Sequence, residues 1–260
     1  DMKSKYSKLA PDKIESLSMC EVFVFGSNLQ GHHTGGAARY AYKHFGAEWG
    51  VGIGPTGQCY AIPTMHGGVD DIRPYVEDFV KYAKSHPLNR FLLTRIGCGI
   101  AGFSDKQMAM LFYDAGAFAL MDEAHFPLKG AGVLHLLYHR DEMVAARQAL
   151  LASYPDVMGL RHCYAHIRSV LNSRPYATKQ DLLGSTREGY RITERVLKLF
   201  FDLHFFLEKD GTIVPRQVQP IDMAENPAYQ EFCAERDRKE KRLTAAWQMK
   251  AAAIAALWNN

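Results

Sequence analysis

The sequence has no long hydrophobic run. None of its 260 residues belongs to a stretch that approaches the roughly 20 uninterrupted apolar residues of a membrane-spanning helix. The opening residues 1–15 also lack the apolar core of a secretory signal peptide. We therefore expect a cytoplasmic protein with no membrane partner.

Cysteine is scarce, and its pattern excludes two classes of protein. The five cysteines are odd in number, widely spaced and form no C-x-x-C pair; they are Cys20, Cys59, Cys98, Cys163 and Cys233. Neither a disulfide framework nor a zinc site has this spacing. We predict reduced thiols and no metal site.

Neither sign of charge is in large excess. The net charge is +3, with 15 basic and 15 acidic residues in 1–155 and the remaining 16 and 13 in 156–260. A nucleic-acid-binding protein usually carries a concentrated basic patch. We therefore expect no polynucleotide partner. Apolar residues make up 47% of the chain and charged residues 23%, which is typical of a globular protein and excludes a disordered one.

What the first part of the chain does contain is alternating strand and helix patterns. Short apolar runs rich in β-branched and aromatic residues alternate with segments of helical spacing. The predicted strands are 21–26, 57–64, 90–97 and 132–139, and the predicted helices are 72–86, 104–124 and 141–154. This order predicts a layered α/β domain over residues 1–155, with helices on a largely parallel sheet.

The pattern changes after Pro155. Helices are predicted over 160–172, 186–207 and 226–258, with one short strand at 211–215. Ser185 and Glu188 have capping-box spacing at the start of the second helix. We expect residues 156–260 to form a helical extension, and the alanine- and tryptophan-containing last helix is compatible with a homodimer.

The first loop of chemical interest follows the strand 21–26. Gly26, Ser27 and Asn28 end that strand, and Thr34 is placed to cap a helix that begins at Gly35. Small residues at a helix N-terminus leave backbone N–H groups open to an anion, and the helix dipole favours negative charge there. The loop therefore predicts a phosphate site.

A second glycine-rich loop, "RIGCGIAGFSDKQ" (95–107), follows the strand 90–97. Ser104 and Gln107 have capping-box spacing for the next helix. Loops that follow parallel strands lie on one edge of a sheet, where open α/β sheets bind ligands. The two loops together predict a diphosphate held between them.

A Rossmann-type oxidoreductase that binds NAD is the alternative. Residues 97–102 fit G-x-G-x-x-G, which normally opens the first strand-to-helix turn and expects an acidic residue about 20 positions later, at the end of the next strand. Asp122 and Glu123 have the right count but precede the next predicted strand. The match is therefore one of spacing alone.

Three stretches, "VFGSNLQGHHTGGAARYA", "GQCYAIPT" and "RIGCGIAGF", resemble the macro domain superfamily, whose members bind ADP-ribose. The resemblance covers residues 20–155 and is closest to the terminal ADP-ribose protein glycohydrolases and their bacterial antitoxin relatives. It implies a three-layer fold with a mainly parallel or mixed sheet. It also implies that Asn28 contacts the distal ribose and that the two loops hold the diphosphate. The implied ligand-binding residues are Ser27, Asn28, Gly31, Gly35, Gly36, Ala37, Gly97, Cys98, Gly99, Ile100, Ala101, Gly102 and Phe103.

Two departures from this subgroup bear on catalysis. Ala101 stands where these glycohydrolases have an aspartate, and Met65 stands where they have a catalytic lysine. We therefore expect binding or sensing of ADP-ribose, or of an ADP-ribosylated macromolecule, with no required cofactor. Hydrolysis with His32 or His33 as acid or base stays open, and Cys98 has no assignable partner base.

Overall fold

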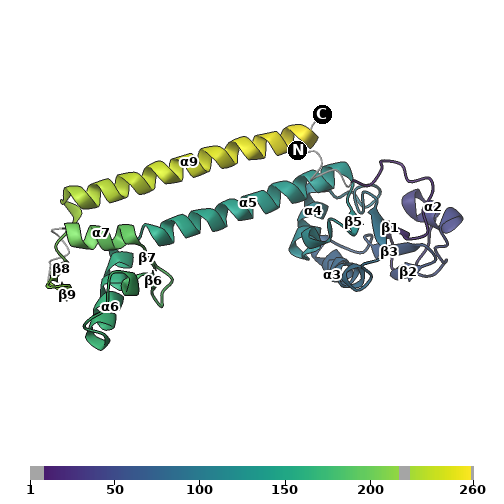
Figure 1. Cartoon of the computed structure of the whole chain (residues 1–260). Coiled ribbons are helices and arrows are strands. Elements are labelled where there is room, and N and C mark those ends of the chain that lie inside the picture. The colour runs from purple at the N-terminus through teal and green to yellow at the C-terminus, as the bar shows by residue number, and fades with distance from the viewer. Residues whose placement is uncertain (1–8, 217–222, 259–260) are drawn as a thin grey trace. The chain divides into compact units, whose positions relative to one another are not determined.

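The computed structural model describes residues 9–216 and 223–258 of the chain. The chain forms two compact units (Figure 1): unit 1 is Asp1–Arg140 with Ala251–Asn260, and unit 2 is Asp141–Lys250. The sequence places the boundary at 155/156, whereas this division falls inside helix α5 (Leu128–Ser153). The expectation about a signal peptide rests on residues 1–15, and the first eight of these lie outside the described residues.

A five-stranded mixed sheet lies at the centre of unit 1, in the order β2-β3-β1-β4-β5. β1 (Glu21–Ser27) pairs in parallel with β3 (Cys59–Pro63) and with β4 (Arg90–Leu93), and β4 pairs in parallel with β5 (Ala124–His125). The edge strand β2 (Gly54–Thr56) is antiparallel to β3. The three neighbouring strands β3, β1 and β4 correspond to predicted strands, and their carboxyl ends share one edge.

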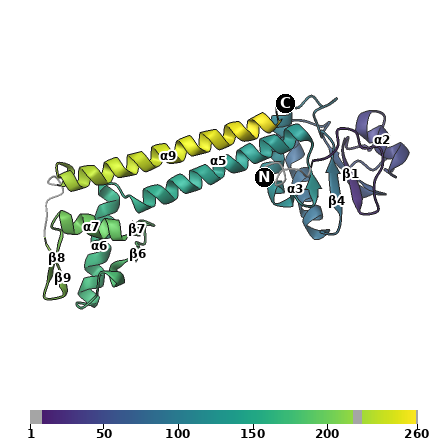
Figure 2. The same ribbon diagram turned by 45° about the horizontal axis from the view of Figure 1, so that its top comes forward.

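Helices cover both faces of this sheet. Successive side chains of a strand point to opposite faces, so neighbouring apolar residues of β1 pack against different helices. On one face Phe25 of β1 belongs to a buried cluster with α2 (Gly36–His44). On the other, Val24 belongs to a cluster with α3 (Val69–Ser85) and α4 (Asp105–Asp114). Figures 1 and 2 show α2 apart from α3 and α4. Unit 1 is therefore a helix–sheet–helix arrangement.

The strand prediction for residues 132–139 is wrong. These residues lie within α5, which also contains the predicted helix 141–154. A short, mostly apolar run fits a buried strand or a buried helical segment equally well, and periodicity alone does not separate them. The two-residue strand β5 occupies the sheet edge beside β4 instead.

The helix predicted over 104–124 begins as expected but ends early. Its capping box is confirmed: Gln107 N donates to Ser104 Oγ (3.2 Å), and Ser104 N donates to Gln107 Oε1 (2.9 Å). α4 ends at Asp114, and Gly116 follows with φ +80°. A left-handed glycine at this position ends a helix. A 3₁₀ turn (Ala117–Leu120) then leads toward β5.

Unit 2 begins within α5 and continues into helix α6 (Val157–Ser173), which matches the predicted helix 160–172. The helix predicted over 186–207 is wrong over its first half. β6 (Gly184–Ser185) and β7 (Arg191–Ile192) form a hairpin there, and Gly189 in its turn has φ +88°. A helix cannot pass through this backbone conformation.

Helix α7 (Glu194–Asp202) follows that hairpin and is capped by Thr193 rather than by Ser185. A second hairpin joins β8 (Phe206–Lys209) to β9 (Thr212–Pro215), so the predicted strand 211–215 is present. Unit 2 therefore contains two hairpins among its helices, whereas the expected helical extension had only one short strand.

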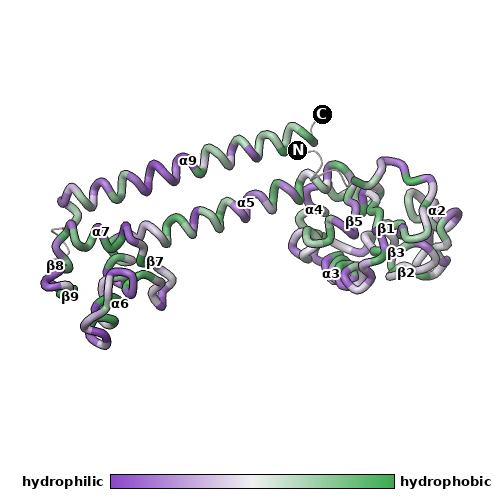
Figure 3. The backbone as a smooth tube through the Cα atoms, viewed as in Figure 1, coloured by the Kyte–Doolittle hydropathy of each residue, from purple (hydrophilic) through white to green (hydrophobic). Residues whose placement is uncertain are grey.

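The last helix, α9, spans Pro227–Trp258. In unit 2 it lies beside α5, where Arg147 forms an ion pair with Glu240 and Lys250 Nζ lies 3.4 Å from Glu142 Oε2. Its charge run, "ERDRKEKR", falls in the hydrophilic stretch of α9 in Figure 3. Within the described ranges, no helix combines the length and the apolar character needed to cross a membrane.

Candidate functional site

A cavity of about 400 Å³ lies at the carboxyl ends of β1, β3 and β4. Its volume falls in the range of small-molecule sites, roughly 300–1,000 Å³. The two glycine-rich loops meet across it: a Cβ added at Gly35 would lie 3.6 Å from Ile100 Cδ1. The sequence-based expectation that these loops share one edge of the sheet agrees with this geometry.

Most of the predicted binding residues line this cavity. They are Ser27, Asn28, Gly35, Gly36, Ala37, Gly97, Cys98, Gly99, Ile100 and Ala101, together with His32. Four predicted residues are not among its lining: Gly31, Gly102, Phe103 and His33. Phe103 instead packs against the core, and its N–H donates to Gly97 O (2.9 Å), which closes the second loop.

The side chain of Asn28 holds the first loop in shape. Its Nδ2 donates to His32 O, and its Oδ1 accepts from His32 N, both at 2.9 Å. An amide group has a second N–H and a second acceptor lone pair. Asn28 therefore braces the loop and still offers one donor and one acceptor at the cavity wall.

A segment that the sequence did not single out, residues 48–52, supports this loop from behind. Ser27 Oγ donates to Gly52 O, and Gly50 N donates to Gly31 O (3.0 Å). Gly31 is buried here with φ +68°, and a Cβ on it would lie 2.3 Å from Val51 N. Gly31 is thus required for the close backbone packing of the loop and is not among the residues that line the cavity.

Unpaired backbone N–H groups lie in both loops. The first-turn N–H groups of α2 have no intrahelical acceptor, and its N-cap is Gly35, which has no side chain to cap them. The prediction of Thr34 as the cap is therefore wrong by one residue, and Thr34 lines the cavity instead. In the second loop, Gly99, Ile100 and Ala101 donate their backbone N–H to no acceptor in the described chain. Such groups suit an anion.

Arg95 adds a positive charge to the cavity wall, a contribution that the sequence reading missed. Its Nε and one terminal nitrogen donate to Asp105, at 3.0 and 2.7 Å. This pairing holds the pKa of the Asp105 carboxyl below its usual range. A guanidinium has five N–H donors, so donors remain for a ligand. The sequence feature that could have predicted this role is the position of Arg95 just after β4, at the carboxyl edge of the sheet.

His33 is a structural residue rather than a free acid or base. It is 2% exposed, its Nε2 donates to Glu48 O (2.9 Å), and its ring meets Phe25 edge-on at 5.5 Å. Among the described residues, its buried Nδ1 has no hydrogen-bond partner. The imidazole is therefore held in the wall behind the cavity.

We expect His33→Ala to lower the free energy of unfolding by about 2 kcal/mol, because it removes a buried hydrogen bond and ring contacts. Urea denaturation followed by circular dichroism measures this change. The exposed neighbour provides the comparison: His32→Ala should cost less than about 1 kcal/mol. Equal costs for the two variants would contradict the structural role.

Cys98 lies on the cavity wall, but its thiol is poorly suited to nucleophilic attack. Burial raises the pKa of this thiol to about 11, with a further contribution from the nearby Asp105 carboxylate. The reactive form of cysteine is the thiolate. At neutral pH, Cys98 is therefore a small neutral wall residue.

Alkylation should show this directly. In a Cys20→Ser variant, which removes the exposed cysteine, iodoacetamide should modify Cys98 slowly at pH 7.5 and progressively faster as the pH approaches about 11. Peptide mass spectrometry locates the modified site. Rapid modification of Cys98 at pH 7.5 would show that the thiol is activated.

The positions aligned by resemblance with catalytic groups carry no titratable side chain. Met65 and Ala101 both line the cavity. Neither can supply the amine or the carboxylate that the resembling glycohydrolases use. Among residues 9–216 and 223–258, no group of three or more His, Cys, Asp or Glu side chains is placed to hold a metal ion.

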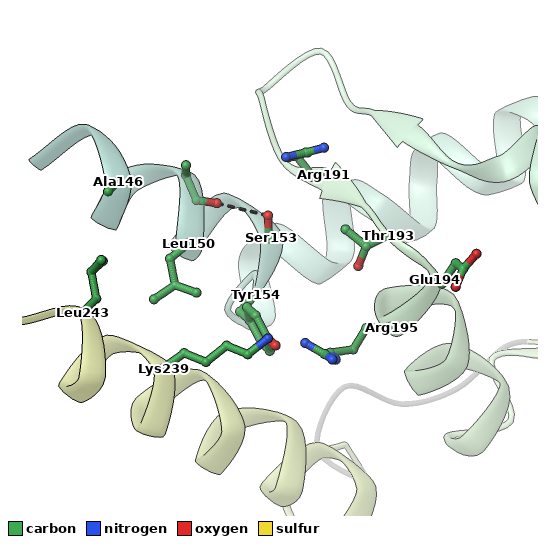
Figure 4. Close-up of a pocket in the computed structure, with 11 residues that line it drawn as sticks. Ala146, Leu150, Ser153, Tyr154, Arg191, Thr193, Glu194, Arg195, Lys239 and Leu243 are labelled. Carbon is green, nitrogen blue, oxygen red and sulfur yellow. Dashed lines mark hydrogen bonds between the residues drawn. The ribbon is translucent and has the colours of Figure 1, made fainter. Parts of the chain in front are cut away.

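A larger cavity of about 700 Å³ lies within unit 2 (Figure 4). The Tyr154 ring lies under two cations, with Arg195 Cζ at 5.0 Å and Lys239 Nζ at 4.9 Å from its centroid. Glu235 accepts a hydrogen bond from the Tyr154 hydroxyl (3.0 Å) and pairs with both cations (2.9 and 3.4 Å). These groups satisfy one another, so they stabilise unit 2 by joining the residue that follows α5 to α7 and α9.

Comparisons of the chain with protein-family models, curated proteins and solved structures found no match. The resemblance to macro domains thus rests on the loop residues themselves.

Proposed function

We propose that unit 1 is a macro-like module that binds a nucleotide diphosphate of the ADP-ribose type, free or attached to a macromolecule. The observation that carries the proposal is the meeting of two glycine-rich loops, from the parallel strands β1 and β4, across one cavity. The diphosphate lies between the α2 N-terminus and residues 99–101, near Arg95.

Three features of the cavity suit a diphosphate more than a neutral ligand. Backbone N–H groups from two directions bind phosphate oxygens without desolvating a side-chain charge. Arg95 supplies a cation capable of a charge-assisted hydrogen bond. Among the described residues that line the cavity there is no carboxylate side chain, and the nearby Asp105 carboxylate is paired with Arg95.

The proposed role is binding rather than turnover. Met65 and Ala101 provide no reactive group, the Cys98 thiol is protonated at neutral pH, and His33 is buried outside the lining. Among the described residues that line the cavity, His32 is the one imidazole. General acid–base catalysis needs an imidazole positioned against a reacting group, and the described lining residues include no carboxylate that could orient His32.

Isothermal titration of the full chain with ADP-ribose tests this function, with NAD and AMP as comparators. We expect ADP-ribose to bind in the micromolar range or tighter and AMP more weakly, because AMP lacks the diphosphate. Preference for intact NAD would support the oxidoreductase alternative. No heat with any of the three would contradict the proposal.

A further inference from the structure

Exposed aromatic side chains adjoin the cavity on the side of the first loop. The His32 ring, which lines the cavity, stacks on Trp49 with centroids 5.3 Å apart and planes 16° apart. Tyr42 meets Trp49 edge-on at 5.9 Å. Trp49 is 52% exposed and Tyr42 47% exposed. We call these three residues, His32, Trp49 and Tyr42, the aromatic rim.

The backbone beneath the aromatic rim is well fixed. His32 N donates to the Asn28 side chain, and Gly50 N, next to Trp49, donates to Gly31 O. Trp49 also lies over buried His33, at 6.5 Å and 80°. The backbone that carries the rings is therefore fixed by hydrogen bonds and the rings contact one another, which lowers the entropy cost of stacking on them.

Exposed apolar side chains also lie on the cavity wall itself. Ile100 is 79% exposed and Met65 50% exposed, and both line the cavity. Large exposed apolar groups that adjoin a polar cavity mark a binding surface. A ligand that was only a diphosphate would leave this surface and the aromatic rim uncovered.

We propose that the ligand carries a planar heteroaromatic ring that stacks on the aromatic rim, with His32 as the contacting ring and Trp49 behind it. This inference rests on the proposed function, because the diphosphate between the two loops brings the ring to the rim. Two parts of a nucleotide supply such a ring: the adenine of ADP-ribose, or a nicotinamide attached to the distal ribose, as in NAD.

The test uses calorimetric titration of the full chain with pyrophosphate, ADP-ribose and NAD. His32→Ala removes the contacting ring, and His32→Phe keeps a ring of similar area without its nitrogens. Leu88→Ala, at a position 88% exposed on a different loop, is the matched control. Thermal unfolding of each variant verifies that it is folded.

We expect His32→Ala to weaken the affinity for the ring-bearing ligand about tenfold, in line with alanine substitution at base-stacking aromatic residues. Its affinity for pyrophosphate should stay within about twofold of wild type. His32→Phe should retain most of the affinity, and Trp49→Ala should weaken it severalfold. A loss with both ADP-ribose and NAD assigns adenine to the rim, and a loss with NAD alone assigns nicotinamide.

Two results would overturn the proposal in distinguishable ways. Suppose that wild type binds pyrophosphate and ADP-ribose, and that His32→Ala leaves the affinities for pyrophosphate, ADP-ribose and NAD unchanged. The stacking inference then fails while the diphosphate site stands. If wild type binds none of the three, the proposed function fails and the stacking inference falls with it.

Discussion

Gly99→Asp should abolish ADP-ribose binding without unfolding the protein. Gly99 lines the cavity, a Cβ at this position would meet nothing within 4 Å, and its backbone is not in the left-handed region. The new carboxylate would lie beside the proposed diphosphate site. Two like charges about 4 Å apart repel by about 4 kcal/mol at an effective dielectric constant near 20. We expect a loss of affinity of at least about 100-fold.

The matched control is Gly99→Asn, which has nearly the same shape and no charge. It should bind within about fivefold of wild type, and both variants should unfold at the wild-type temperature within a few degrees. Calorimetric titration and thermal unfolding measure the two quantities. If the aspartate and asparagine variants bind ADP-ribose equally well, the diphosphate does not lie at this loop.

Gly52→Ala should have the largest effect on stability among single methyl additions near the site. A Cβ on Gly52 would lie 1.9 Å from the backbone O of Asn28, which cannot move without displacing the first loop. Forcing a methyl group into packed backbone costs about 3 kcal/mol or more. We expect a loss of this size in the free energy of unfolding, together with weakened ADP-ribose binding.

Gly99→Ala serves as the control for Gly52→Ala, because it adds the same methyl group in open space. It should change the free energy of unfolding by less than about 1 kcal/mol. Urea denaturation of both variants measures the difference. A Gly52→Ala variant as stable as Gly99→Ala would show that residues 48–52 do not hold the first loop.

The parts of the fold that the sequence predicted best are those with strong local signals. Strand β1 is a short aromatic and β-branched run, and α4 begins at a capping box whose two hydrogen bonds join residues three apart. The errors fall where the local signal fits two structures. Residues 132–139 are mostly apolar, with His135 and His139 among them, and only the surrounding helix α5 shows that they are helical.

The same distinction holds for the candidate site. The glycine loops were recognisable because each follows a strand and precedes a helix. The support from Gly52 could not be predicted, because its contact with Asn28 joins backbone groups 24 positions apart and leaves no pattern in the side chains. Burial likewise separates two adjacent histidines that look equivalent in the sequence: His32 is exposed, whereas His33 is 2% exposed.

The central claim is that backbone N–H groups of the two loops bind a diphosphate. Amide ¹H–¹⁵N NMR spectra of the labelled full chain, recorded during titration with ADP-ribose, test it most directly. The claim predicts large downfield proton shifts at Gly36, Gly99 and Ile100, which pyrophosphate reproduces and adenosine does not. Shifts confined to residues outside loops 26–38 and 95–103, or equal shifts with adenosine, would contradict it.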